Sequence, residues 1–140
     1  MVIELSVFME NRPGKLEAIT RILAESGINI RGISVASEGE FGVIKIIVSE
    51  PDRAYGVLRE NHFTVSKRKM VMVEIKDKPG GLHDLLVLLS MNRINIEDCY
   101  GIALEEGKKA AIILEVGQFP RTEKILRGEG YTVLSDQEPG

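Results

Sequence analysis

The sequence predicts an α+β fold made of two copies of one βαββαβ unit. Residues 11–30 and 77–96 are identical at seven of twenty aligned positions, which indicates an internal repeat. In both copies a Pro-Gly turn, a helical pattern and an Ile-Asn-Ile segment follow one another, and a hairpin pattern and a second helix come next. The chain of 140 residues is therefore predicted to form two domains of about 70 residues, 1–68 and 69–140.

The elements of the first copy follow from hydrophobic spacing. Residues 2–9 alternate between apolar and polar side chains, which predicts a strand with one buried face. The turn at residues 11–14 ends this strand, and Leu16, Ile19 and Leu23 then recur at helical spacing. The same patterns place the remaining elements in order: strands at 28–36 and 43–48 joined by a turn at 37–40, a helix from Pro51, and a strand from Phe63.

The second copy repeats this order with a hairpin that is two residues longer. Its predicted elements are a strand at 71–75, a helix over 82–89, strands at 94–104 and 110–116, a helix that includes Leu126, and a strand at 132–134, before a polar tail from Ser135 to Gly140 that we expect to be frayed. In each copy two helices cover one face of a four-stranded antiparallel sheet, which is a ferredoxin-like sandwich. Residues 67–69 contain no Gly, Ser or Pro linker, so we expect the last strand of the first unit to run almost directly into the first strand of the second, a join that restricts independent motion. We also expect the two units to pack side by side into an eight-stranded antiparallel sheet with helices on one face.

Composition excludes several function classes. A net charge of −3 and a pI near 5.5 argue against a nucleic-acid partner, which needs a basic face. No apolar run approaches the ~18 residues of a membrane span, so no membrane partner is predicted. The single cysteine, Cys99, excludes an intrachain disulfide and predicts a reducing, cytoplasmic location. We expect Cys99 to be buried and unreactive, because no basic cluster lies near it in the sequence.

The strand–helix turn is the candidate binding element of each copy. Proline fixes φ at the helix entry, and glycine lets other atoms approach the backbone closely. The unpaired N–H groups of a helix start, together with the helix dipole, favour a carboxylate or a phosphate. Asn29 and Asn95 follow the helices and offer both a donor and an acceptor, Asn11 adds a further contact, and Asp77 can meet an ammonium group. These residue types predict a site for a small zwitterion.

The candidate site therefore combines the turn, the helix start and the following strand of both copies. Its predicted ligand-binding residues are Asn11, Arg12, Pro13, Gly14, Lys15, Leu16, Ile28, Asn29, Ile30, Asp77, Lys78, Pro79, Gly80, Gly81, Leu82, Ile94, Asn95 and Ile96. No catalytic residue, metal site or cofactor is predicted, because two histidines and one cysteine give no metal-ligand spacing and no phosphate-loop pattern occurs.

A Pro-Gly-x-Leu turn, a helix and an Ile-Asn-Ile strand within a βαββαβ unit resemble the ACT domain, a regulatory module that senses amino acids. The resemblance covers the chain twice and implies a tandem, stand-alone, non-catalytic protein that forms a homodimer and regulates an enzyme or a transcription partner. In that family, ligands lie between paired domains, against the strand–helix loop of one and the neighbouring strand of the other. The first copy is similar to the serine-sensing ACT domain of phosphoglycerate dehydrogenase, whose two ligand-contacting asparagines match Asn11 and Asn29, although Met9 replaces a histidine there. The first copy is therefore the favoured site.

Three alternatives remain open. The units can act as a ligand-free dimerisation or interaction scaffold, with strands 28–36 and 94–104 as docking edges. An acylphosphatase-like enzyme is supported only by Arg12 beside the Pro-Gly turn. RNA binding is supported only by the shared topology, because the strand positions that would stack bases are Ile and Val.

Overall fold

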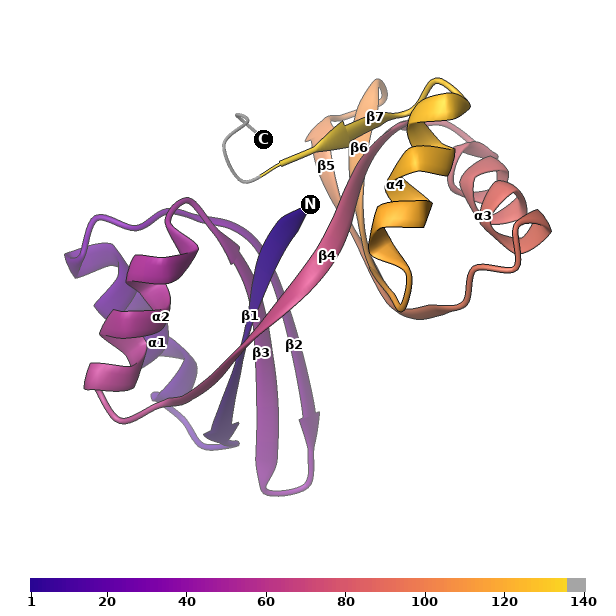
Figure 1. Ribbon diagram of the computed structural model, residues 1–140. Helices are drawn as coiled ribbons and strands as arrows, with labels where there is room; N and C mark the ends of the chain where they lie inside the picture. Colours follow the sequence, from indigo (N-terminus) through magenta and orange to yellow (C-terminus); the bar gives the residue numbers. More distant parts are fainter. Residues whose placement is uncertain (136–140) are drawn as a thin grey trace. The chain divides into compact units, whose positions relative to one another are not determined.

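The computed structural model describes residues 1–135, so the predicted tail beyond Ser135 lies outside the described residues. The elements in chain order are β1 (Val2–Glu10), α1 (Lys15–Glu25), β2 (Ile30–Glu38), β3 (Phe41–Val48), α2 (Pro51–Glu60), β4 (Thr64–Lys76), α3 (Gly81–Met91), β5 (Ile96–Glu105), β6 (Lys109–Val116), α4 (Phe119–Gly128) and β7 (Thr132–Leu134). In each repeat the two helices lie on one face of an antiparallel sheet, which confirms the predicted α+β class and the βαββαβ order (Figure 1).

The described residues form seven strands instead of the predicted eight. The last strand of the first repeat and the first strand of the second are one continuous strand, β4, of 13 residues. No Gly or Pro interrupts it, so nothing in the sequence ends one strand before the next begins. The chain divides into two compact units, Ile3–Arg68 and Lys69 onward with Met1–Val2, which we call the N-terminal unit and the C-terminal unit. The side-by-side packing of the units stays a prediction.

In the N-terminal unit, β1 pairs antiparallel with β3, and β3 pairs with the edge strand β2. The core between this sheet and helices α1 and α2 consists of Leu5, Val7, Ile19, Leu23, Ile28, Ile44, Ile46, Val48, Ala54 and Leu58. Leu5 and Val7 of β1 point into this core, whereas the alternate residues Glu4 and Ser6 lie on the face of the strand that is turned away from the helices.

In the C-terminal unit, β4 takes the central place of β1. It pairs antiparallel with β6 on one side and β7 on the other, and β5 is the edge strand beside β6. The core against α3 and α4 consists of Val71, Val73, Ile75, Leu85, Leu89, Ile94, Ile112, Leu114, Val116, Leu126 and Val133. Among the described residues, no helix is long and apolar enough to cross a membrane.

Three loops meet at one end of each unit, which we call the loop end. They are the strand–helix turn, the hairpin tip, and the loop before the last strand of the repeat: residues 11–14, 39–40 and 61–63 in the N-terminal unit, and 77–80, 106–108 and 129–131 in the C-terminal unit. Backbone hydrogen bonds join the first two loops, because Asn11 N–H donates to the Glu40 carbonyl (2.7 Å) and Asp77 N–H to the Lys108 carbonyl (3.0 Å). The third loop lies beside them since the last strand of the repeat runs antiparallel next to the first.

Candidate functional site

An open pocket lies at the loop end of each unit. The C-terminal pocket has a volume of about 720 Å³ and is lined by residues 74–78, Gly81, Asp84, 107–109 and 129–132. The N-terminal pocket has a volume of about 370 Å³ and is lined by residues 8–10, Lys15, Phe41 and 61–64. Adding 66 to the residue numbers before the hairpin tip, or 68 to those after it, converts every lining residue of the N-terminal pocket into a lining residue of the C-terminal pocket. Both pockets therefore occupy the same place in the repeat.

The helix that begins at each pocket has an uncapped start. Gly14 and Gly80 hold the left-handed conformation that the turn requires, with φ of 89° and 87°, and neither helix has a side-chain cap. The first amide of each helix donates to the turn, but in the described chain no acceptor is found for the second and third, which are those of Leu16 and Glu17 in α1 and of Leu82 and His83 in α3. Each start therefore keeps two donors and the positive end of the helix dipole, as an anion requires.

Gly81, the first residue of α3, lines the C-terminal pocket at a place where the backbone leaves no room for a side chain. A Cβ atom placed on Gly81 would lie 2.3 Å from the carbonyl oxygen of Lys76, which no side chain tolerates without a shift of the backbone. The equivalent residue of the N-terminal unit is Lys15, whose side chain lines its own pocket. The larger volume of the C-terminal pocket is consistent with this difference.

One wall of the C-terminal pocket is acidic. Burial raises the pKa of the Tyr131 hydroxyl above its ordinary value, and the negative charges of Asp84 and Glu129 raise that pKa further. The carboxylates of Asp84 and Glu129 therefore both act on the Tyr131 hydroxyl, and all three residues line the pocket. This wall is suited to an ammonium group, which three acceptor-bearing side chains can surround.

Lysines gather on a different part of the same lining. Lys76 and Lys109 lie directly opposite each other on β4 and β6, and both line the pocket. Like charges in that position repel each other across the ladder. A bound carboxylate between them would reduce this repulsion. In the N-terminal unit the equivalent pair is Glu10 and Phe41, which carries no such repulsion.

The predicted polar residues of the turns brace the hairpin tips. The Gly107 N–H donates to Asp77 Oδ2 (2.8 Å), and Asn11 Nδ2 donates to the Gly39 carbonyl (3.3 Å). Asp77 still lines the C-terminal pocket, whereas Asn11 does not line the N-terminal one. These two side chains therefore have a structural task that the sequence analysis did not foresee.

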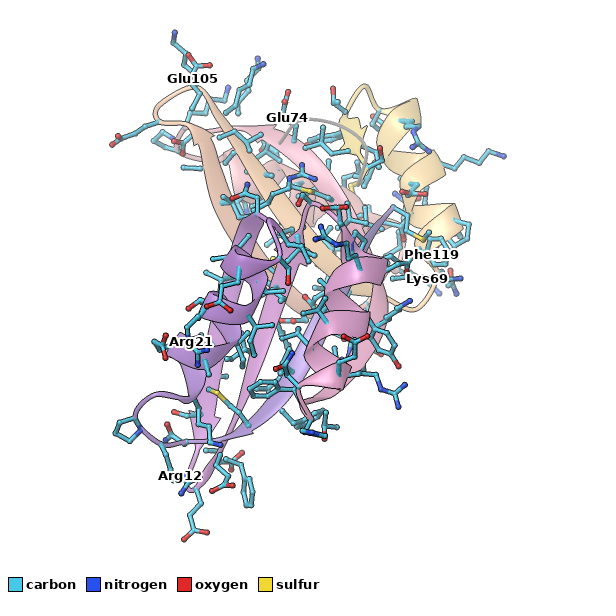
Figure 2. The ribbon with its side chains drawn as sticks, turned by 90° about the vertical axis from the view of Figure 1, so that its left-hand side faces the viewer. Arg12, Arg21, Lys69, Glu74, Glu105 and Phe119 are labelled. Carbon is cyan, nitrogen blue, oxygen red and sulfur yellow. The ribbon has the colours of Figure 1, made fainter. Side chains whose placement is uncertain are left out.

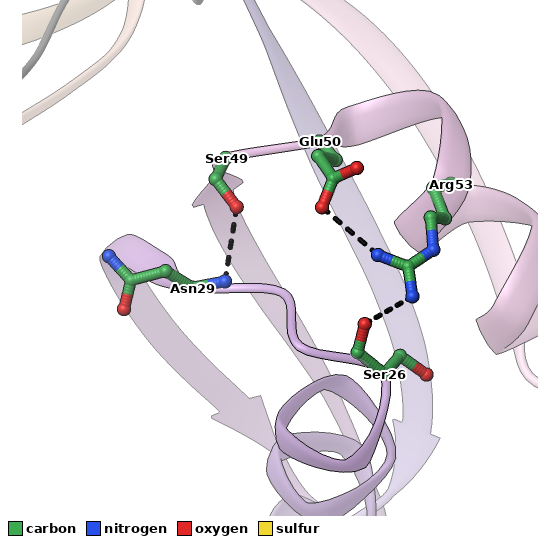
Figure 3. Close-up of polar contacts among 5 residues, drawn as sticks. All are labelled: Ser26, Asn29, Ser49, Glu50 and Arg53. Atoms are coloured by element: carbon green, nitrogen blue, oxygen red, sulfur yellow. Dashed lines mark hydrogen bonds and ion pairs between the residues drawn. The ribbon is translucent and has the colours of Figure 1, made fainter.

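The asparagines of the Ile-Asn-Ile segments lie at the other end of each unit. The Asn29 N–H donates to Ser49 Oγ (3.1 Å), the Ser49 N–H donates to the Asn29 carbonyl (3.0 Å), and the side-chain amide of Asn29 points away from these contacts (Figure 3). The eight residues of β3 that separate this end from the loop end span about 26 Å. Within one unit, the structure therefore does not bring Asn11 and Asn29 to the same small ligand.

A polar brace holds the chain beside Asn29. Arg53 donates to the Ser26 carbonyl and pairs with Glu50 at 3.0 Å (Figure 3). The isoleucines on either side of the asparagines also serve the fold: Ile28 and Ile94 are buried core residues, and Ile30 and Ile96 pack against the cores. Asn95 has the same place before β5, whose first residue Ile96 pairs with Val116 at the end of β6 far from Lys109.

Of the predicted site residues, Lys15 lines the N-terminal pocket, and Asp77, Lys78 and Gly81 line the C-terminal one. The others do not line these two pockets. Sequence analysis missed the walls from the hairpin tip and from the loop before the last strand, which include His62, Phe63, Lys108 and Tyr131. The predicted topology itself was the signal, because it places the loop before the last strand beside the strand–helix turn.

Arg12, which supports the acylphosphatase alternative, lies on the turn and projects away from the N-terminal unit (Figure 2). Its Nε pairs with Glu10 Oε2 at 3.0 Å, and Arg12 does not line the N-terminal pocket. The structure therefore adds no support for an anion-binding arginine in that pocket.

The expectation for Cys99 is wrong in one respect. Cys99 is exposed instead of buried, because β5 is an edge strand. Burial of part of the side chain, followed by the charge of Asp98, raises the pKa of its thiol, which favours the less reactive protonated form. Within residues 1–135, no group of three or more His, Cys, Asp or Glu side chains is arranged to hold a metal ion.

Comparisons with known proteins place this geometry in a family. The family model of the ACT domain pair matches residues 1–138. The chain is 30% identical to the solved structure of protein BT0572 from Bacteroides thetaiotaomicron, with a TM-score of 0.91 over 97% of this chain and 93% of that one. A search of curated proteins found no match.

Two more distant structures share the fold. The regulatory subunit of aspartate kinase from Thermus thermophilus, in its ligand-free form, is 13% identical with a TM-score of 0.70, over 91% of this chain and 92% of that one. The same subunit from Thermus flavus is 15% identical with a TM-score of 0.63, over 89% and 88%. Because the family model covers nearly the whole chain and both repeats have its βαββαβ topology, this protein belongs to the ACT domain pair family.

Proposed function

We propose that this chain is a non-catalytic regulatory module that binds a small amino acid in the pocket of its C-terminal unit. Membership of the ACT domain pair family supports the regulatory, ligand-binding role. The proposal differs from the sequence-based preference for the first copy, because the C-terminal pocket is about 720 Å³ and the N-terminal pocket about 370 Å³.

The observation that carries the proposal is the balance of charge within the C-terminal pocket. Its acidic lining residues are Glu74, Asp77, Asp84 and Glu129, and its basic lining residues are Lys76, Lys78, Lys108 and Lys109. A lining that offers both carboxylates and ammonium groups fits a zwitterion better than an anion or a cation alone. Each charge-assisted hydrogen bond to such a ligand contributes about 1.5–3 kcal/mol.

The finer parts of the prediction stay proposals. A site that combines the loop of one domain with the strand of another requires a second unit, because Asn11 and Asn29 lie at opposite ends of the N-terminal unit. The proposal includes a homodimer, which would supply that second unit, a regulated enzyme or transcription partner, and a cytoplasmic location. The similarity of the first copy to a serine-sensing domain also stays a prediction.

A second candidate function is a docking edge for another protein. Strand β2 pairs only with β3 in the described residues, and its Ile33 and Val35 are 45% and 47% exposed. An unpaired edge with apolar side chains is a surface to which another strand can add. This function needs no ligand, so ligand binding separates the two candidates.

A thermal-shift and calorimetric screen of the twenty amino acids tests the proposal. A ligand present at 100 times its dissociation constant adds about 2.7 kcal/mol to the free energy of unfolding, which raises the melting temperature by several degrees. We expect Asp84→Asn and Glu129→Gln to reduce this gain, since they remove charge from the acidic wall. Glu97→Gln is the matched control, because Glu97 is exposed on β5 of the same unit and does not line the pocket.

Two results would contradict the proposal. The first is that no amino acid at millimolar concentration raises the melting temperature of the unmodified chain. The second is that Glu97→Gln reduces the gain as much as Asp84→Asn does, which would mean that the effect of the ligand is unrelated to the C-terminal pocket.

A further inference from the structure

We propose that the pocket of the N-terminal unit is a second ligand site, and that it takes a small carboxylate that carries an aromatic group and no ammonium. This site differs in place and in chemistry from the amino-acid site of the C-terminal unit, and it does not require that site to bind anything. Its walls lie entirely within residues 8–64 of the N-terminal unit.

The walls of this pocket are mainly apolar. Phe8, Met9, Phe41 and Phe63 line it, and the side chains of Phe8 and Phe41 are 49% and 66% exposed. Two phenylalanines that remain in water beside a pocket gain from an apolar ligand that covers them. Aromatic side chains also stack favourably on an aromatic ring, at offset or edge-to-face geometry. The lining therefore favours an aromatic group on the ligand.

The groups that would hold an ammonium are missing from this pocket. At the places of Asp84, Glu129 and Tyr131, the N-terminal unit has Ala18, Asn61 and Phe63. Glu10 is the remaining acid of the lining, and its carboxylate pairs with Arg12 at 3.0 Å. A ligand with a free ammonium would therefore lose its hydration without gaining an available carboxylate.

A carboxylate, in contrast, has a partner. Lys15 lines the pocket, and in the described chain its ammonium has no ion-pair partner. Lys15 also begins α1, whose Leu16 and Glu17 amides have no acceptor among those residues. With Glu10 neutralised by Arg12, one free positive charge remains at the wall, which matches one carboxylate.

His62 is a further polar residue of this pocket. It holds a left-handed backbone conformation with φ of 70°, whereas the equivalent residue of the C-terminal unit is Gly130 with φ of 87°. A side chain in this conformation strains the backbone, and glycine does not. This conformation belongs to the end of α2, because the His62 N–H donates to the Arg59 carbonyl (3.0 Å). The imidazole lines the pocket and can donate a hydrogen bond to the ligand.

The volume of the N-terminal pocket, about 370 Å³, suits a ligand with a single ring, because it lies near the lower limit of small-molecule sites.

Nuclear magnetic resonance of the full chain, labelled with ¹⁵N, tests this inference with 3-phenylpropionate as the probe. We expect the acid to shift the amide signals of residues 15–17 and 62–64. The amine with the same carbon skeleton, 3-phenylpropylamine, should leave them unchanged because it lacks the carboxylate. We expect Lys15→Gln to weaken binding of the acid about 10-fold and Phe41→Ser about 5-fold, as expected for loss of a charge-assisted contact and of an aromatic wall.

Two matched controls accompany these variants. Arg21→Gln removes a positive charge from the same helix, but Arg21 pairs with Glu17 and does not line the pocket. Lys109→Ser changes the position of the C-terminal unit that is equivalent to Phe41. Neither should change the affinity for 3-phenylpropionate by more than about 2-fold, since neither touches the N-terminal pocket.

His62→Gly distinguishes binding from folding. We expect it to weaken binding of 3-phenylpropionate several-fold and to raise the melting temperature, because glycine relieves the backbone strain at φ of 70°. A merely structural histidine would give the higher melting temperature with unchanged affinity.

The inference is overturned if 3-phenylpropionate at millimolar concentration shifts none of these amides, or if the amine binds equally well. It is also overturned if the unmodified chain sediments as a dimer that does not bind the acid whereas Phe41→Ser sediments as a monomer, because Phe41 would then be covered by a second copy of the chain. If 3-phenylpropionate does not bind, amino acids can still shift the amide signals of residues 81–84 in the C-terminal unit. This inference and the proposed function can therefore fail separately.

Discussion

The pockets of the two units are built on the same backbone but differ on almost every wall. The N-terminal unit has Lys15, Phe41 and Phe63 where the C-terminal unit has Gly81, Lys109 and Tyr131. None of the seven identical positions of the repeat lines either pocket; those positions form the turns, the cores and the strand starts. The repeated motif therefore specifies the fold, and the residues that differ between the copies specify the chemistry of each pocket.

The largest effect expected from this comparison is at Gly81. Gly81→Ala places a Cβ atom 2.3 Å from the Lys76 carbonyl oxygen, so the backbone of the turn has to move. We expect the free energy of unfolding to fall by about 1–3 kcal/mol, as in other overpacked sites, measured by urea denaturation. Lys15→Ala is the control at the equivalent position and should change it by less than about 0.5 kcal/mol. An unchanged urea midpoint for Gly81→Ala would show that the two turns are equally tolerant.

The second prediction compares the side chains that brace the hairpin tips. Asp77→Ala removes a charged acceptor from the Gly107 N–H at 2.8 Å, and we expect a loss of about 1–2 kcal/mol in the free energy of unfolding. Asn11→Ala removes a longer, neutral contact of 3.3 Å to Gly39 in an exposed loop, so a loss near 0.5 kcal/mol is expected. Urea denaturation measures both losses. Equal losses would mean that charge and length of the contact do not matter at this loop.

The third prediction concerns the loops that follow the first helix of each unit. Arg93 has φ of 57° where the N-terminal unit has Gly27 with φ of 70°. Arg93→Gly should raise the free energy of unfolding by about 0.5–1 kcal/mol, because the relief of left-handed strain exceeds the added chain entropy of glycine. Gly27→Arg should lower it by a similar amount, since a Cβ atom there meets nothing within 4 Å and only the backbone strain remains. A stabilising Gly27→Arg would contradict this interpretation.

Much of the fold could be predicted from the sequence because periodicity reports which side of an element is buried. The spacing of Leu16, Ile19 and Leu23 predicts the helix, and the two glycines of the Pro-Gly turns hold the conformation that the helix starts need. The direct join between the two units was predicted from the absence of a linker at residues 67–69, and β4 shows that the join is a single strand, so the expected two strands are one.

The walls of the pockets could be predicted only in part. Lys15, Asp77, Lys78 and Gly81 lie close in sequence to the turn and were included. Tyr131 and the residues around it are far from the turn in sequence and reach it only through the pairing of β7 with β4. The position of Asn29 shows the opposite limit. The donor and the acceptor of its side chain predicted that Asn29 shares a ligand with the turn, but the length of the helix and of the strand between them places the two at opposite ends of the unit.

The smallest expected effect is a pH dependence that only one unit has. Burial and the charges of Asp84 and Glu129 raise the pKa of the Tyr131 hydroxyl in the folded state, whereas the equivalent Phe63 does not titrate. Below a pH of about 10, the ordinary value, the phenol is protonated in both states and its contribution is fully present. Above that pH the unfolded state releases the proton first, so the free energy of unfolding falls until the pH passes the folded pKa.

We therefore expect urea midpoints of the unmodified chain to fall more steeply between about pH 9 and 11 than those of Tyr131→Phe. Tyr55→Phe, in the N-terminal unit and outside both pockets, should keep the steep fall; a Tyr131→Phe curve parallel to that of the unmodified chain would mean that the acidic wall does not act on this phenol.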